Sequence, residues 1–314
     1  MHRFAAALVA LGLVATPSIG WTEELVPQVP PRQQLGQHLF IPRDGVIDPF
    51  TTSFVASSSG VASGGANGPT FDLQGKQVSL EDYKILAYSQ LFTGQWGWTD
   101  WWALRLKVLG SAYTGANASG AAGVGVNGVV RGSFGTTLGF RLAENLRVGA
   151  VVDVAWGPSV ALSILDAIRD SISAGSVQTP VQNTYSTTVN GTLSLAWTMT
   201  RGLGGIFNAS YLNGVVEVNQ GSSDQDLLAF QGALDLDLRE LGSIPLGLAL
   251  DYSAGYSTGN RRFRRYVLGL GFFYTGRPGL TLGLDLGYRR APLGTHDVFV
   301  TSFSGVFSLR FSFD

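Results

Sequence analysis

Cysteine is absent from all 314 residues of the chain. Its absence excludes disulfide bonds, thiolate metal sites, cysteine nucleophiles and an acylated N-terminal cysteine. Charged residues are also scarce at 14% of the sequence, against about a quarter in an average soluble domain. This scarcity indicates that much of the surface does not face water. The net charge of −1 argues against a nucleic-acid partner, which would favour a basic patch.

Long hydrophobic runs are missing after the first twenty residues. None approaches the roughly 18 to 20 residues that a membrane-spanning helix needs, although apolar residues make up 45% of the chain and the mean hydropathy is +0.18. Glycine is abundant instead, with 42 residues beside 18 Phe, 10 Tyr and 7 Trp, a composition typical of strands and turns. The composition therefore leaves a soluble all-β protein or a membrane-spanning barrel.

The N-terminus has the pattern of a secretory signal peptide. His2 and Arg3 precede an apolar stretch, and the small residues Ser18 and Gly20 fit the −3 and −1 positions of a cleavage site. We therefore expect residues 1–20 to be a cleaved signal peptide. The alternative is a buried N-terminal helix.

Apolar residues recur at every second position from about residue 50 to the C-terminus. A soluble sandwich alternates in the same way, with its apolar face turned inward. Here the segments run about 11 to 16 residues, longer than ordinary strands and long enough to cross a bilayer when tilted. Charge mostly falls on the face opposite the apolar stripe. The clearest segment is 280–289, in which Leu280, Leu282, Leu284, Leu286 and Tyr288 oppose Thr281, Gly283, Asp285, Gly287 and Arg289.

Aromatic residues gather at the ends of these segments, as two lipid interfaces would select. This pattern favours a barrel in a membrane over a soluble sandwich. One group is Trp156, Tyr185, Tyr252, Tyr266 and Tyr288, and the other is Phe140, Trp197, Tyr274, Phe311 and Phe313.

Turn residues divide the chain into twelve segments, which predicts an all-β fold: a closed antiparallel transmembrane β-barrel of about 12 strands over residues 47–314. The connectors alternate between short and long. Because bacterial barrels have short periplasmic turns and longer outer loops, both chain ends are expected in the periplasm. The predicted strands are 48–58, 83–95, 99–112, 126–142, 145–157, 184–200, 203–218, 226–240, 244–257, 263–275, 280–291 and 298–313.

Three stretches outside these strands carry their own predictions. Residues 21–46, with four prolines, form a periplasmic N-terminal segment that is either an extended tail or tucked into the periplasmic opening. The Ser- and Gly-rich stretch 59–82 is expected to be a flexible outer loop. Residues 158–175 predict a short amphipathic helix in an outer loop, since apolar residues recur there at every fourth position. That helix lies either on the rim or in the mouth as a constriction.

The last strand, with Phe307, Leu309, Phe311 and Phe313 on one face, resembles the C-terminal assembly signal of bacterial outer-membrane proteins, although Asp314 follows the terminal aromatic. The stretches ENLRVGAVVDVAW and RPGLTLGLDLGYR resemble units of proteobacterial transporter-like barrels of the aromatic-degradation-pathway type. The resemblance implies location in the Gram-negative outer membrane, contact with its lipid, insertion by the barrel-assembly machinery and, less directly, uptake of small molecules.

Assigning the polar face of each strand to the interior places basic and acidic residues on opposed walls of the lumen. If the lumen is open, such walls set up a transverse field that orients dipolar solutes. The alternative is a lumen filled by paired side chains. The predicted pore-lining residues are Arg105, Lys107, Arg131, Arg147, Asp153, Asp235, Asp251, Asp285 and Arg289, with Arg141, Asp237, Arg239, Arg265 and Arg310 on the same faces.

These features favour a porin-like outer-membrane channel or facilitator for the passive passage of a small-molecule solute. The alternative is a structural or partner-binding barrel with a filled lumen. An enzyme is not expected, because His296 beside Asp297 is the one candidate general base and no matching serine motif accompanies it. Neither a metal nor a cofactor is expected, since a metal site needs three or four convergent ligands and no phosphate-binding glycine loop has the required context.

Overall fold

The computed structural model describes residues 34–36, 38–41, 43, 45–71, 77–116, 125–162, 181–218, 221–242, 244–257, 264–277, 279–292 and 299–313. The expected signal peptide, the pair His296 and Asp297, and most of the predicted loop helix lie outside these residues. No helix in the described ranges is both long and apolar enough to cross a membrane.

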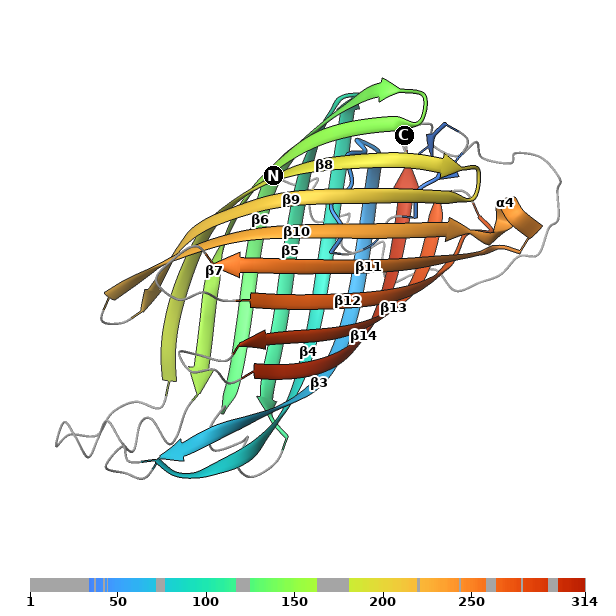
Figure 1. Ribbon diagram of the computed structural model, residues 1–314. Helices are drawn as coiled ribbons and strands as arrows, with labels where there is room; N and C mark the ends of the chain where they lie inside the picture. Colours follow the sequence, from blue (N-terminus) through green and yellow to red (C-terminus); the bar gives the residue numbers. More distant parts are fainter. Residues whose placement is uncertain are drawn as a thin grey trace, which may run out of the picture.

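Twelve antiparallel strands form one closed barrel, in which each strand pairs with its neighbours in the chain and the last pairs with the first (Figure 1). The prediction of a closed twelve-strand barrel is confirmed. Antiparallel closure leaves no unpaired strand edge, as a bilayer interior requires. The strands are β3 (Ser53–Phe71), β4 (Gln77–Thr99), β5 (Trp102–Gly115), β6 (Val126–Ala143), β7 (Leu146–Leu162), β8 (Val181–Thr200), β9 (Leu203–Val218), β10 (Gly221–Asp237), β11 (Leu246–Ser257), β12 (Arg264–Tyr274), β13 (Leu280–Pro292) and β14 (Phe299–Phe313).

Alternating residues of each strand face outward and form an apolar belt. Leu193 is 68% exposed and Phe303 is 66% exposed, values that only lipid contact makes favourable on so large a surface. The aromatic groups predicted for the two rims also point outward: Trp156 and Tyr252 are exposed towards one end, and Phe140 and Trp197 towards the other.

Two-residue turns join β4 to β5, β6 to β7 and β8 to β9 at the end where the C-terminal residues lie, and the two longest connectors, between β5 and β6 and between β7 and β8, lie at the opposite end. The predicted long connector 219–225 is an exception, because only residues 219 and 220 separate β9 from β10. Since short turns are periplasmic in bacterial barrels, we call the end with the C-terminal residues the periplasmic end. A five-residue helix, α4 (Leu238–Gly242), replaces the predicted end of the eighth strand in one periplasmic connector. Arg239 therefore lies in this helix and donates to Thr275 O at 3.3 Å, so its predicted position on a strand facing the lumen was wrong.

The first hairpin is longer than the sequence predicted. Residues 59–71 and 77–82, expected in a flexible outer loop, belong to β3 and β4. The period is hidden because the outward positions of β3 include serines, which bond across the hairpin: Gln90 Nε2 donates to Ser57 Oγ at 2.9 Å, and Ser59 Oγ bonds to Gln90. Similarly, residues 158–162 of the predicted loop helix are strand, because they continue the ladder between β7 and β8.

Candidate functional site in the barrel lumen

The described residues between 34 and 52 lie inside the periplasmic half of the lumen, and we call them the plug. It begins with a small two-stranded sheet of β1 (Gln34–Leu35) and β2 (His38–Leu39) and runs directly into β3 (Figure 1). Wall side chains from several strands bind its carbonyl groups. Thr198 Oγ1 donates to Leu35 O at 2.7 Å, Gln231 Nε2 to Gly45 O at 2.9 Å, Arg147 Nε to Pro49 O at 2.8 Å, and Gln95 Nε2 to Phe50 O at 2.9 Å.

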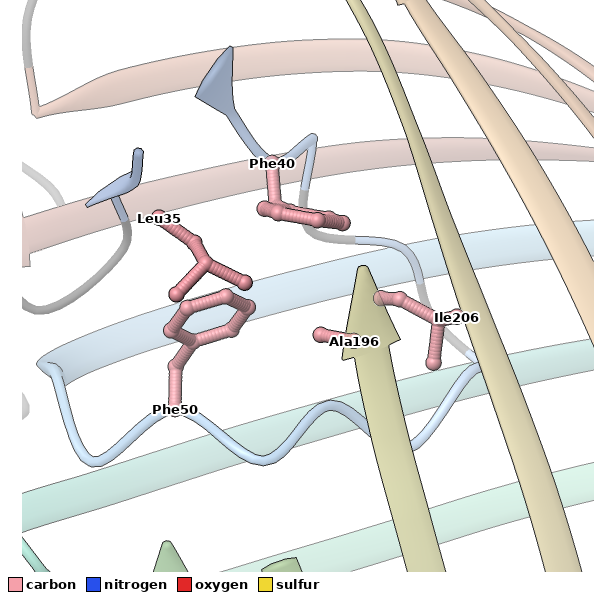
Figure 2. Packing of buried hydrophobic residues seen from close by; sticks show 5 residues of the cluster. All are labelled: Leu35, Phe40, Phe50, Ala196 and Ile206. Atoms are coloured by element: carbon pink, nitrogen blue, oxygen red, sulfur yellow. The ribbon is translucent and has the colours of Figure 1, made fainter. Parts of the chain in front are cut away.

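An apolar cluster fixes the middle of the plug against the wall. Leu35, Phe40 and Phe50 of the plug pack with Ala196 and Ile206, which point inward from β8 and β9 (Figure 2). The cavity bordered by this cluster holds only about 10 Å³, less than or about the space one water needs. The plug therefore closely fills this section of the lumen.

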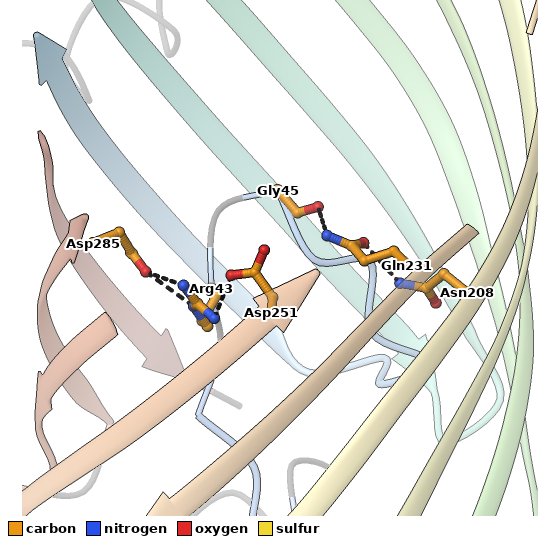
Figure 3. Close-up of polar contacts among 6 residues, drawn as sticks. All are labelled: Arg43, Gly45, Asn208, Gln231, Asp251 and Asp285. Atoms are coloured by element: carbon orange, nitrogen blue, oxygen red, sulfur yellow. Dashed lines mark hydrogen bonds and ion pairs between the residues drawn. The ribbon is translucent and has the colours of Figure 1, made fainter. Parts of the chain in front are cut away.

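Arg43 connects the plug to two carboxylates of the wall. Its Nη1 lies 2.6 Å from Asp251 Oδ1 of β11, and its Nε donates to Asp285 Oδ1 of β13 at 2.9 Å (Figure 3). The Arg43 side chain is only 4% exposed. Buried charges are tolerated when they are paired, so removing the plug would leave two carboxylates uncompensated.

His38 forms a second polar anchor. Its Nε2 lies 3.1 Å from Asp235 Oδ1, and its Nδ1 lies 3.1 Å from Arg201 O. Both partners are acceptors only, so both bonds form together only when both ring nitrogens carry a proton. Asp235 also accepts the backbone N–H of Ile41 at 2.7 Å.

The protonation of His38 reflects these contacts. Burial by itself lowers the pKa of His38, but the hydrogen bond and negative charge of Asp235, with smaller contributions from Arg201 O and Asp237, outweigh burial and raise the pKa above its ordinary value.

Glycines on the luminal face make room for the plug. A Cβ on Gly139 or Gly149 would collide with Pro49, and a Cβ on Gly204 would collide with His38. Sequence reasoning missed this role, although the glycines alternate with apolar residues along the strands. That pattern was a signal for a backbone lying against the inner wall.

The predicted pore-lining residues separate into those that hold the plug and those beyond it. Asp235, Asp251, Asp285 and Arg147 all contact the plug. The acidic side chains predicted to face an open lumen are therefore covered at this level, because His38 and Arg43 of the plug bind them. Farther out, Arg105 Nη2 donates to Asp153 Oδ2 at 2.9 Å, and Arg131 Nη2 donates to Ser186 Oγ at 2.9 Å, while Lys107 shares the luminal face of β5 and Arg289 that of β13.

The outer half of the lumen contains a cavity of about 290 Å³. Its lining residues lie on the same faces of their strands as residues that contact the plug. Ile85 and Gln95 share one face of β4, and Arg289 and Asp285 share one face of β13. They therefore face the lumen. The lining comprises Ala62, Gly64, Ile85, Ala87, Tyr113, Arg289, Ala291, Val300 and Ser302.

The fold resembles solved outer-membrane barrels. The β domain of the Bordetella autotransporter BrkA has a TM-score of 0.53 at 10% identity, over 83% of this chain and 100% of the other. Together with the outward apolar belt, this likeness decides the fold. The chain has the fold of a bacterial outer-membrane β-barrel.

Other solved barrels resemble this one more distantly. A FadL homologue from Pseudomonas aeruginosa has a TM-score of 0.48 at 10% identity, over 85% of this chain and 91% of the other. The Pseudomonas putida toluene transporter TodX has a TM-score of 0.42 at 10% identity, over 83% and 89% respectively. Searches with protein-family models and against curated sequences found no match. These likenesses concern the fold and carry no statement about substrate.

Proposed function

We propose that the barrel is a channel for small solutes and that the plug closes it at the periplasmic end. The observation that carries this proposal is the way in which the plug is held. Adjacent wall strands share continuous ladders of backbone pairs, for example thirteen residue pairs between β13 and β14. Within the described residues, the plug contacts the wall only through side chains and apolar packing, with no backbone ladder.

Such contacts can break without opening the barrel itself. Each wall-to-plug hydrogen bond contributes about 0.5–1.5 kcal/mol, whereas unpairing a transmembrane strand exposes many backbone groups to lipid at several kcal/mol each. Movement of the plug therefore opens the lumen without breaking any backbone ladder of the wall. The small residues lining the outer cavity leave space for a solute on the other side of the plug.

The absence of cysteine permits a direct test with an engineered lock. A Cβ on Gly36 would lie 3.9 Å from Thr198 Cβ, within the range that a disulfide requires. Residue 52 is already joined to β3, so a Gly36→Cys/Thr198→Cys bridge would hold the plug at both ends. Single-channel conductance and liposome flux would be measured for the oxidised and reduced forms.

Conductance that is lost on oxidation and recovered on reduction supports a gating plug. The single variants Gly36→Cys and Thr198→Cys are the matched controls. The first carries the strain of a side chain at the φ of 60° that Gly36 adopts, the second loses the same hydroxyl, and neither can form the bridge; the conductance of both should not respond to oxidant. Equal conductance in the oxidised and reduced double variant would show that the plug is not the gate.

A second candidate function is a structural or partner-binding barrel with a permanently filled lumen. The tight fit around Phe40 and Ile206, with about 10 Å³ of free space, favours it. In that case the folded double-cysteine variant shows no conductance when oxidised or reduced, and variants that lack Arg43 or His38 show none either.

A further inference from the structure

Two arginines, Arg265 and Arg289, face the outer half of the lumen, and no carboxylate in the described ranges is paired with either of them. Arg265 of β12 and Arg289 of β13 lie on adjacent strands, at positions offset by two residues in the register that pairs Val267 with Arg289. Arg265 alternates in phase with Phe273, which packs against the plug residue Ile41, so its side chain also points inward. Diagonal neighbours on one sheet face are about 7–8 Å apart.

These guanidinium groups differ from the other luminal arginines. Arg43 and Arg105 each bind a carboxylate, and Arg147 binds plug and wall carbonyls. In the part of the chain that the structure describes, no hydrogen bond or ion pair engages Arg265 or Arg289. The nearest acids on the same strand pairings, Asp251 and Asp285, are bound to Arg43.

The cavity beside Arg289 is otherwise mainly apolar. Ile85, Val300 and three alanines form most of its wall, and the hydroxyl groups of Tyr113 and Ser302 add two polar points. Its volume of about 290 Å³ is close to the lower end of small-molecule sites. A pocket with an apolar wall and a basic edge discriminates against inorganic ions, which gain nothing from the wall, and against neutral solutes, which gain nothing from the arginines.

We propose that this cavity binds a small organic anion, with its apolar body against Ile85 and Val300 and its anionic group on Arg289, which lines the cavity; Arg265 on the adjacent strand adds a second positive charge near that group. The proposal rests on the proposed channel function for its role, as the site at which a solute waits on the outer side of the plug. Guanidinium groups bind carboxylates through paired N–H donors, and such charge-assisted bonds are strong where water is partly excluded.

The test is the binding of benzoate and of its neutral isostere benzamide to the folded, full-length protein in detergent, measured by isothermal titration calorimetry. Benzoate should bind at least about tenfold more tightly than benzamide, the difference that one charge-assisted hydrogen bond supplies. Acetate, which carries the charge without the apolar body, should bind more weakly than benzoate. Raising the salt concentration should weaken benzoate binding.

Arg289→Gln and Arg290→Gln form a matched pair of variants. Arg290 is one residue away but points outward over the Phe299 ring, 4.5 Å from its centroid, so its loss removes the same charge from the other face of the strand. Arg289→Gln should weaken benzoate binding about tenfold or more, while Arg290→Gln should leave it within about twofold. Circular dichroism and cooperative thermal unfolding would establish that both variants fold.

Equal affinities for benzoate and benzamide, no benzoate binding at millimolar concentration, or equal losses in the two variants would each overturn the proposal. Binding is measured without flux, so the two proposals fail separately. A protein that binds benzoate but never conducts retains the site and loses the channel. A protein that conducts through the released plug but does not distinguish benzoate from benzamide retains the channel and loses the site.

Discussion

The two halves of the lumen treat their charged side chains in opposite ways. Both are walls of polar and small side chains inside one barrel, yet the periplasmic half pairs its charges with the plug, whereas no carboxylate among the described residues binds Arg265 or Arg289 of the outer half. In the periplasmic half, burial makes each unpaired charge costly, and a segment of the chain supplies the partners. Charged side chains in the lumen therefore do not by themselves indicate a pore. Their binding partners decide whether they anchor the plug or can bind a solute.

The strongest test of this contrast is Arg43→Ala. The change leaves Asp251 and Asp285 buried without their cation, and breaking a buried pair costs about 3–5 kcal/mol. The plug should leave the wall, so conductance should rise and residues 34–52 should become sensitive to protease. The triple variant Arg43→Leu/Asp251→Asn/Asp285→Asn removes the uncompensated charge and should recover closure. Closure of Arg43→Ala equal to that of the natural chain would contradict the anchoring role.

Gly247→Val tests the shape of the plug site rather than its charge. A Cβ at Gly247 would collide with the side chain of Ile41 in the plug, and such overpacking costs about 1–3 kcal/mol. We expect a higher open probability with an intact barrel, measured by conductance and thermal unfolding. Gly191→Val is the control, because nothing lies within 4 Å of a Cβ at that lipid-facing position; an equal response of the two variants would refute the steric explanation.

A matched pair of arginine variants compares the two halves directly. Arg147→Gln removes the donor to Pro49 O and should loosen the plug by about 1–3 kcal/mol. Arg131→Gln removes a donor to Ser186 beyond the plug and should change stability by less than about 0.5 kcal/mol. Thermal unfolding and protease sensitivity of the plug would rank them, and the reverse order would show that the division into halves is incorrect.

The smallest expected effect is a dependence of closure on pH through His38. Because its pKa is raised in the folded plug, its contribution is fully present below the ordinary value of 6.5 and is lost as the pH rises through the raised pKa. A neutral ring can keep only one of its two bonds, a loss of about 1 kcal/mol. Open probability should therefore rise with pH over this window, and His38→Gln should flatten the profile. If the open probability of His38→Gln depended on pH as strongly as that of the natural chain, a group other than His38 would be responsible.

The period of two predicted the barrel from sequence because each strand meets lipid on one face and polar surroundings on the other. From β5 onward the predicted strands agree with the observed ones to within about five residues. The first hairpin was predicted too short, because Ser57, Ser59 and Gln90 bond to one another on the outer face and the apolar stripe is interrupted there. The plug itself has no period, since its partners are supplied by eight or more separate strand positions and not by its own neighbours in sequence.

The candidate site was only partly accessible to such reasoning. Inward charges followed from alternation, but the pairing of Arg43 with Asp251 and Asp285 joins residues more than 200 positions apart, and local sequence carries no record of so distant a contact. The same limit explains why Arg265 and Arg289 could be placed on the luminal face but not recognised as unpaired. Whether these two arginines have a carboxylate partner depends on which partners the other charged residues of the lumen bind.

The position of the plug in the chain has a consequence for the order of folding. The plug precedes β3, yet its partners lie on strands distributed through the chain as far as β14, where Arg310 lies 4.0 Å from Asp48, and contacts such as Ile41 to Asp235 are separated by 194 residues. Contacts of such long range form slowly, because the loop between them must close first. The segment made first is thus seated last, after the wall that receives it exists. The plug can therefore dock fully only in a barrel that has closed in its correct register.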